Sequence, residues 1–232
     1  MREYFDLTGI SVTDQQLSQF EAFFDLLISE NEKYNLTGIT DKQDVYVKHF
    51  IDSILINKLD FDFHNKSMMD IGTGAGFPAI PLKIMEPSLS VTGLDALNKR
   101  IHFIELVCDS LGLSQMTLLH GRAEDFGHDL KHREQYDFVV SRAVAELRLL
   151  LEFTMPFVKV DGYFLAYKSL KSQTELEDAE KALRVLKAKL VDIVEFKLPL
   201  DYGTREIMIF QKTEKLDKRY PRKPGIPKKS PL

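Results

Sequence analysis

A chain of 232 residues with 44% apolar residues suits one α/β domain with a modest extension. No apolar run is long enough to cross a bilayer, and no signal-peptide pattern opens the chain, so we expect a cytoplasmic protein without a membrane partner. The single cysteine, Cys108, excludes an internal disulfide framework and a cysteine-based metal cluster.

The net charge of −4 is unevenly distributed along the chain. The segment from residue 218 to the end contains no acid and six cations, which are Lys218, Arg219, Arg222, Lys223, Lys228 and Lys229. Four prolines in the same segment argue against a helix or a central strand, so we expect an extended, solvated arm. Such an arm suits contact with a phosphate backbone, and a merely solubilising tail is the alternative.

Two amphipathic helices are predicted in the first third of the chain. Segments 13–16 and 40–43 both have the capping-box form, and apolar residues then recur at helical spacing to about residues 32 and 55. His49 and Asp52 lie three apart and share a helical face, for which periodicity favours exposure to water over a ligand contact. The connecting loop carries the polar residue Asn35.

The most informative motif is Gly72-x-Gly74-x-Gly76, which follows the apolar run 68–71. It predicts a strand, a tight turn that approaches a ligand through its backbone, and a helix over 79–86. The dinucleotide fingerprint requires glycine at position 77, where this chain has Phe77. The turn therefore favours S-adenosylmethionine over NAD, while an ordinary glycine-rich connection stays open.

From residue 67 onward, predicted strands and helices alternate, as in a parallel sheet covered on both faces. The strands are expected at 68–71, 89–94, 116–119, 136–140, 162–167, 191–196 and 206–210. The last two form an antiparallel edge hairpin. Helices are expected at 98–111, around 147–151 and at 174–190.

Several polar residues follow the predicted strands, where ligands bind in doubly wound sheets. Asp95 ends the second strand and is placed to accept hydrogen bonds from two ribose hydroxyls. Ala123 and Glu124 follow the third strand and offer a backbone amide and a carboxylate to an adenine edge, although a charged loop is the alternative. Arg142 and Lys168 follow the fourth and fifth strands.

The absence of certain catalytic motifs limits the reactions that this chain could catalyse. His128 and His132 form a degenerate zinc motif without a third ligand, so we expect no metal. Cys108, in a helical pattern, is a poor nucleophile for carbon-5 methylation of a pyrimidine. The segment 141–144 lacks the Asn/Asp-Pro-Pro-aromatic turn used on exocyclic amines. A guanine N7 has a lone pair and no proton to lose, so its methylation requires only alignment of the reactants.

Assembled in this way, the chain resembles the RsmG family, also called glucose-inhibited division protein B, of small-subunit rRNA guanine-N7 methyltransferases. The matching segments are 34–37, 49–53, 70–78, 95–97, 99–100, 141–143 and 220–225, together with Lys168 and Arg205. The resemblance spans nearly the whole chain. Tyr-Asn-Leu-Thr at 34–37 and His-x-x-Asp-Ser at 49–53 are more specific than the glycine motif.

The resemblance implies a Rossmann-like class I S-adenosylmethionine-dependent methyltransferase fold with a mostly parallel seven-stranded sheet, an antiparallel edge strand and an N-terminal helical cap. We expect the cap at 1–65, the core at 66–212 and the basic tail at 213–232. The implied substrate is one guanine, number 527 in the usual rRNA numbering, in the 530 loop of bacterial 16S rRNA.

The same resemblance assigns site residues. The cofactor-binding residues are expected to be Gly72, Gly74, Phe77, Asp95, Ala96, Leu97, Ala123, Glu124 and Arg142. No general base is required, and Arg142 and Lys168 are candidates for positioning the substrate. RNA contacts are expected from Lys168 and Arg205 and, as an inference from charge rather than from the resemblance, from Lys218, Arg219, Arg222, Lys223, Lys228 and Lys229. The expected partner of a monomeric enzyme is 16S rRNA, the small subunit or its assembly intermediate. One alternative is an NAD-dependent oxidoreductase, because Asp95 could bind the ribose of NAD as well as that of S-adenosylmethionine. The other is a non-catalytic rRNA-binding assembly factor.

Overall fold

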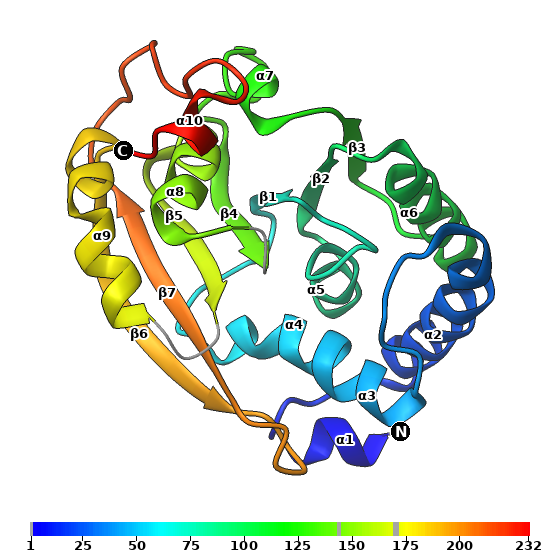
Figure 1. The fold of residues 1–232 in the computed structure, drawn as a ribbon. Helices are drawn as coiled ribbons and strands as arrows, with labels where there is room; N and C mark the ends of the chain where they lie inside the picture. The colour runs from blue at the N-terminus through cyan, green and yellow to red at the C-terminus, as the bar shows by residue number, and fades with distance from the viewer. Residues whose placement is uncertain (1, 143–144, 169–171) are drawn as a thin grey trace.

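The computed structural model describes residues 2–142, 145–168 and 172–232, which form one seven-stranded sheet surrounded by helices (Figure 1). The strands are β1 (Ser67–Ile71), β2 (Ser90–Asp95), β3 (Met116–His120), β4 (Tyr136–Arg142), β5 (Val158–Lys168), β6 (Ala188–Lys197) and β7 (Thr204–Lys212). Their order is β3-β2-β1-β4-β5-β7-β6. The pairs among β1 to β5 are parallel, and β7 is antiparallel to both β5 and β6. The predicted mostly parallel sheet with an antiparallel hairpin at its edge is confirmed.

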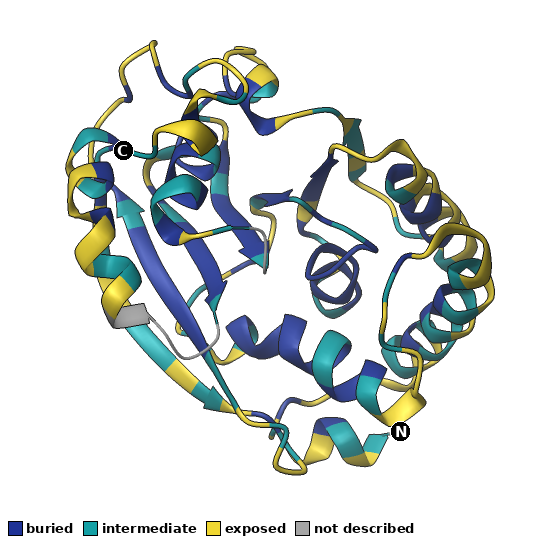
Figure 2. Cartoon of the chain, viewed as in Figure 1, coloured by how far each residue is buried: buried dark blue, intermediate teal, exposed yellow. Residues whose placement is uncertain are grey.

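Helices cover both faces of the sheet, because neighbouring residues of a buried strand point to opposite sides. Met68 and Val140 pack in a cluster with α5 (Ala79–Met85). Met69 and Val139 pack in another cluster with α8 (Leu147–Thr154) and α9 (Ser172–Val185). Figure 2 shows the strands β1 and β4 dark blue along most of their length. None of the described helices is long and apolar enough to cross a membrane.

The N-terminal helices pack on the face that carries α5 and α6 (Asn98–Leu111). They are α1 (Arg2–Asp6), α2 (Asp14–Tyr34), α3 (Lys42–Val45) and α4 (Asp52–Ile54), with a 3-10 turn at Leu55–Lys58. Thr13 forms the predicted capping box with Gln16. At the second helix the prediction is off by one residue, because Asp41 rather than Thr40 accepts from the amide of Asp44, at 3.0 Å.

A π-helical segment, Tyr46–Ile51, joins α3 to α4. Each π turn contains more residues than an α turn, so side chains beyond it are rotated away from the positions that a regular helix predicts. Asp52 is only 4% exposed, and His49 stacks on a buried ring. The expectation that these two side chains face water is therefore wrong.

The predicted helix over 174–190 is too long at its C-terminal end. Helix α9 ends at Val185, and Lys187 adopts a left-handed backbone with φ of 57°. The residues that follow pair with β7, beginning with Ala188 opposite Lys212. Tertiary pairing overrides a local sequence that contains no helix breaker.

The C-terminal segment is docked on the protein rather than extended in solvent. It contains a short helix, α10 (Ile226–Lys229), which lies beside α8 (Figure 1). Leu216 and Tyr220 are 5% and 8% exposed and belong to the same apolar cluster as α8. The prediction of an extended, solvated arm is wrong, because buried side chains of the core bind this segment.

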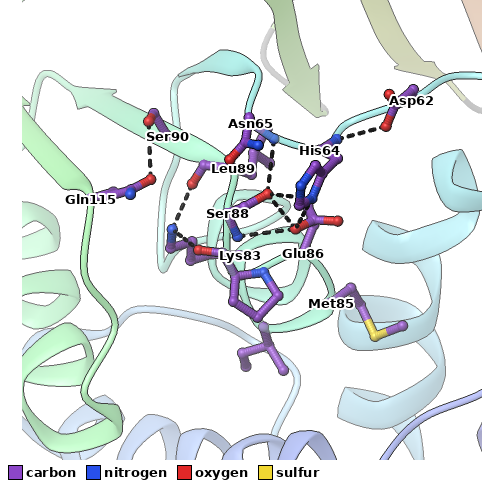
Figure 3. A network of polar contacts seen from close by, with 12 residues as sticks. Asp62, His64, Asn65, Lys83, Met85, Glu86, Ser88, Leu89, Ser90 and Gln115 are labelled. Atoms are coloured by element: carbon purple, nitrogen blue, oxygen red, sulfur yellow. Dashed lines mark hydrogen bonds and ion pairs between the residues drawn. The ribbon is translucent and has the colours of Figure 1, made fainter.

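A buried lysine fixes the connection from α5 to β2, at the end of α5 that lies away from the glycine turn. Lys83 is 2% exposed and donates to the carbonyls of Pro87 and Leu89, at 2.7 and 2.6 Å (Figure 3). Burial lowers the pKa of this ammonium. In the same network, Glu86 accepts from the amide and hydroxyl of Ser88.

Candidate functional site

The glycine turn is bonded to the tip of the neighbouring strand. The amides of Gly72 and Thr73 donate to the carbonyl of Leu94, at 2.8 and 3.1 Å. Gly72, Gly74 and Gly76 have φ of 75°, 59° and 89°, in the region that favours glycine. A Cβ at Gly76 would lie 2.6 Å from Cγ1 of Ile80. The motif is therefore required by backbone conformation and by close packing against α5.

Asp95, at the end of β2, is 4% exposed, and backbone amides on two sides orient its carboxylate. Oδ2 accepts from the amide of Gly74 and Oδ1 from the amide of Leu97, both at 2.9 Å. Nη1 of Arg100 lies 3.1 Å from Oδ2. The Arg100 side chain is 34% exposed, so this ion pair occupies the outer side of the carboxylate. Sequence reasoning missed this contact, although Arg100 stands in the first turns of the helix that follows Asp95.

Apolar surface lies directly beside that carboxylate. Ala96 and Leu97 are both exposed, and Leu97 exposes 46% of its surface. A fixed acceptor next to an exposed aliphatic side chain suits a nucleoside, whose ribose hydroxyls donate and whose base is flat and largely apolar. The residues present therefore fit the adenosine part of S-adenosylmethionine.

Ala123 and Glu124 lie in α7 (Ala123–Phe126), a single turn of helix, and both are 8% exposed. Within the described residues, the Glu124 carboxylate has no hydrogen-bond or ion-pair partner. Its oxygens are not among the fully buried side-chain atoms that lack a partner, so they are open to water or to a ligand. This agrees with the position expected for an adenine contact, which stays a prediction.

Phe77, the residue that separates this motif from a dinucleotide site, is 5% exposed and packs against the helical cap. Its ring stacks on His49, with centroids 4.5 Å apart and planes at 21°. The Arg142 guanidinium lies 5.2 Å from the ring centroid, within reach of a cation–π interaction. The end of the turn, the cap and the end of β4 therefore meet at one aromatic ring.

Arg142 determines which ring nitrogen of His49 carries the proton. Its guanidinium donates to Nδ1 of His49, at 3.2 Å, and to the carbonyl of Lys48, at 2.8 Å. Because a guanidinium only donates, Nδ1 is the acceptor, and Nε2 carries the proton that is donated to Oγ1 of Thr37, at 2.9 Å. Burial, together with the Arg142 charge, lowers the pKa of His49 to about 3, so its ring is neutral.

Asp52 connects the cap to two strands. Its Oδ2 accepts from Nη1 of Arg142, at 2.9 Å, and Oδ1 lies 3.2 Å from Nε of Arg205 on β7. Burial raises the pKa of this carboxyl, and the two guanidinium groups oppose that rise. The structure thus brings together Arg142 and Arg205, which were expected in different roles.

A second buried carboxyl, Asp70, lies beneath the glycine turn. It is fully buried, and burial raises its pKa to about 7. Oδ2 accepts from the amide of Ala79, at 3.3 Å, while Oδ1 has no hydrogen-bond partner within the described part of the chain. Oγ1 of Thr73 is likewise unpaired there. The turn therefore rests on a carboxyl whose proton equilibrates near neutral pH.

Four of the cations expected to bind RNA are held in ion pairs, namely Arg205 with Asp52, the exposed Arg219 with Asp217, and Lys168 and Arg222. Nζ of Lys168 lies 2.6 Å from Oε2 of Glu175 on α9, and the lysine side chain is 10% exposed. Arg222 is bound to the buried carboxylate of Glu152. The remaining tail cations are exposed, and these are Lys218, Arg219, Lys223, Lys228 and Lys229.

The two histidines of the degenerate zinc motif have hydrogen-bond partners within the protein. Nε2 of His128 lies 2.7 Å from the carbonyl of Pro221, and Nδ1 of His132 lies 2.7 Å from the hydroxyl of Tyr136. Among the residues that the structure describes, no group of three His, Cys, Asp or Glu could hold a metal ion. Burial raises the pKa of the Cys108 thiol to about 11, so Cys108 is no thiolate nucleophile.

The sequence profile of the GidB family, described as rRNA small subunit methyltransferase G, matches residues 16–208. The chain belongs to this family. It is 48% identical over 225 residues to ribosomal RNA small subunit methyltransferase G of Lactococcus lactis subsp. cremoris (strain MG1363), covering 96% of this chain and 94% of that one. It is 50% identical over 225 residues to the protein of the same name from Brevibacillus brevis, covering 97% and 94% of the two chains.

Solved structures show the fold of this GidB family member. A SAM-dependent methyltransferase from Aquifex aeolicus matches with a TM-score of 0.53 and 15% identity, covering 73% of this chain and 93% of that one. TYW2 of M. jannaschii in complex with AdoMet matches with a TM-score of 0.54 and 16% identity, covering 75% and 79%. The fold is the Rossmann-like fold of S-adenosylmethionine-dependent methyltransferases, as the sequence predicts.

Proposed function

We propose that this protein transfers a methyl group from S-adenosylmethionine to N7 of a guanine in the 530 loop of 16S rRNA. The observation that carries the proposal is the Asp95 carboxylate, held by the amides of Gly74 and Leu97 beside the exposed Leu97 side chain. Membership of the GidB family supports rRNA of the small subunit as the substrate. An rRNA substrate also supports a cytoplasmic location.

The cofactor would be held along the carboxyl ends of β1, β2, β3 and β4. Asp95 would accept from the ribose, Leu97 would cover one face of the adenine, and Glu124 would accept from the adenine edge. Arg142 supplies a positive charge beside Phe77, which suits the carboxylate of the methionine part. Gly72, Gly74, Ala96 and Ala123 complete the set through their backbone.

The bound cofactor supplies an electrophilic methyl group on a positively charged sulfur. Because guanine N7 has a lone pair and no proton to lose, this chain would not need to supply a general base. The residues of this chain therefore orient the reactants and exclude water, and alignment supplies the rate increase. The neutral ring of His49 and the ion-paired Asp52 keep Arg142 in one position during the reaction.

The proposed RNA contacts are the exposed cations of the tail, together with Lys168 on β5, Arg205 on β7 and Arg222. Lys218, Lys223, Lys228 and Lys229 are exposed and can meet phosphates from the outer side of the docked tail, and Arg219 is exposed as well but lies 3.1 Å from a carboxylate oxygen of Asp217. Lys168, Arg205 and Arg222 are held in ion pairs, so an RNA contact from them requires either exchange of partners or a shared phosphate.

A methylation assay tests the proposal. Small subunits from a strain that lacks the protein are incubated with the enzyme and labelled S-adenosylmethionine, and N7-methylguanosine is mapped on the 16S rRNA. Label at a guanine of the 530 loop is expected. Binding of the rRNA without incorporation would support the non-catalytic assembly factor, and binding of NAD in place of S-adenosylmethionine in calorimetry would support the oxidoreductase.

A further inference from the structure

The C-terminal tail packs directly against the end of α7. The Gly127 backbone lies so close to Pro221 that a Cβ at position 127 would be 2.7 Å from Cγ of the proline. Nε2 of His128 donates to the Pro221 carbonyl at 2.7 Å. Tyr220 lies in the same apolar cluster as Ala123. The tail therefore packs against the same short helix that carries Ala123 and Glu124, the proposed adenine contacts.

A single arginine joins the two segments. Arg133 is 8% exposed, and Nη1 donates to the carbonyls of Gly127 and Tyr220, at 2.8 and 2.7 Å. Nη2 donates to the carbonyls of Leu216 and Asp217, both at 3.1 Å. Within the described ranges, no carboxylate forms an ion pair with this guanidinium. Its burial is compensated by four carbonyls arranged to fit a planar fork of donors, which a lysine does not possess.

A second buried contact fixes the tail from the side of α8. Glu152 is fully buried, and its carboxylate accepts from Nε and Nη2 of Arg222, at 2.8 and 2.6 Å. Its Oε1 also accepts from the amide of Arg222, at 2.9 Å. A bidentate pair with an added backbone bond sets both the position and the direction of the tail as it passes the helix.

From this geometry we infer that Arg133 is a positioning residue for the cofactor, because it clamps the tail to α7 and thereby fixes Ala123 and Glu124. Helix α7 is one turn long, and the amide of Gly127 donates to the carbonyl of Ala123, at 2.8 Å. The acceptor of Arg133 at Gly127 is thus a single helical turn from the proposed adenine contacts. The tail is part of the cofactor-binding wall. This inference rests on the proposed function.

Arg133→Met tests the inference against a matched control, Lys83→Met. Both variants remove a buried cation that donates to backbone carbonyls, but Lys83 lies on the other face of the sheet, with α5 (Figure 3). Calorimetric titration with S-adenosylmethionine is expected to show a dissociation constant at least roughly tenfold higher for Arg133→Met and within about twofold for Lys83→Met. Thermal unfolding shows whether the two variants are equally destabilised.

Amide hydrogen exchange separates this inference from the proposed function, because it needs no ligand. Arg133→Met is expected to accelerate exchange at residues 123–127, and Lys83→Met is expected to leave these amides protected. Unchanged exchange in Arg133→Met, or equal acceleration in both variants, would overturn the inference whatever the protein binds. Failure of the unaltered chain to bind S-adenosylmethionine would instead contradict the proposed function.

Gly127→Ala provides a second test in case Arg133→Met does not fold. The backbone at Gly127 is right-handed, so alanine requires no change of φ, but the new Cβ would lie 2.7 Å from Cγ of Pro221 and 3.1 Å from the carbonyl oxygen of Ala123, so it presses on both the tail and α7. It is expected to displace the tail, to accelerate exchange at residues 123–126 and to weaken S-adenosylmethionine binding severalfold. A variant that binds the cofactor as tightly as the unaltered chain, with the tail displaced, would overturn the inference.

Discussion

Asp95→Asn is the sharpest test of the cofactor site, because it changes one atom and very little volume. Backbone amides face both carboxylate oxygens, Gly74 at Oδ2 and Leu97 at Oδ1. Whichever way the new amide group turns, its NH2 meets one of these N–H donors and loses that hydrogen bond. An unsatisfied buried donor costs about 1–3 kcal/mol, and we expect the free energy of unfolding to fall by about this amount.

Cofactor binding should be weakened in addition. A hydrogen bond to a charged acceptor contributes about 1.5–3 kcal/mol, which corresponds to a roughly 10- to 150-fold higher dissociation constant for S-adenosylmethionine. Calorimetric titration measures this change. Asp137→Asn is the matched control, because Asp137 also accepts from a backbone amide, that of Ser67, and lies at the opposite ends of the strands. If the dissociation constant of Asp95→Asn for S-adenosylmethionine lies within threefold of that of the unaltered chain, the reasoning is refuted.

Three further predictions concern charge. Asp52→Ala leaves two guanidinium groups facing each other in a buried place, so the free energy of unfolding should fall by about 3–5 kcal/mol in urea denaturation, and a loss below about 1 kcal/mol would contradict the bridging role. Because burial raises the pKa of Asp70 to about 7 from 3.8, the folded state binds the extra proton, and the contribution of Asp70 to stability should fall by up to about 4 kcal/mol as pH rises from about 4 through 7. His49, whose pKa is lowered to about 3, contributes in the opposite direction below about pH 6.5, so the comparison with Asp70→Asn isolates the carboxyl. In urea denaturation at a series of pH values, the free energy of unfolding of Asp70→Asn should fall less, or rise more, over this range than that of the unaltered chain, and an equal pH dependence in both proteins would contradict the prediction. Replacing Lys228 and Lys229 together by alanine should reduce the slope of log affinity for rRNA against log salt by about 1–2 while the affinity for S-adenosylmethionine is unchanged, and an unaltered slope would exclude them as phosphate contacts.

The sheet and the glycine turn were predictable because local signals determine them. The apolar run before Gly72 is buried on both faces as β1, and the change from strand to helical periodicity is clear at each crossover. Asp95 could be assigned because a strand end fixes the side of the sheet on which its residue lies. These features depend on residues close together in the sequence.

The errors lie where distant residues decide the structure. Residues 186–190 read as helix, but pairing with β7 makes 188–190 part of a strand. The inward rotation of His49 and Asp52 depends on a π segment, for which the sequence carries no distinct signal. The tail was expected in solvent because of its prolines and charges, and its anchors are Arg133 and Glu152, about 70 to 87 positions away. Composition alone does not reveal such partners.

The contacts of Arg133 also join segments of the chain that are synthesised at different times. Its acceptors at Leu216, Asp217 and Tyr220 are synthesised 83, 84 and 87 residues after it. Until these residues are synthesised, the Arg133 guanidinium lacks three of its four carbonyl acceptors. On the inference above, the support for Ala123 and Glu124 is completed only once residues 216–220 have been added, so a chain truncated before residue 216 is expected to bind S-adenosylmethionine more weakly.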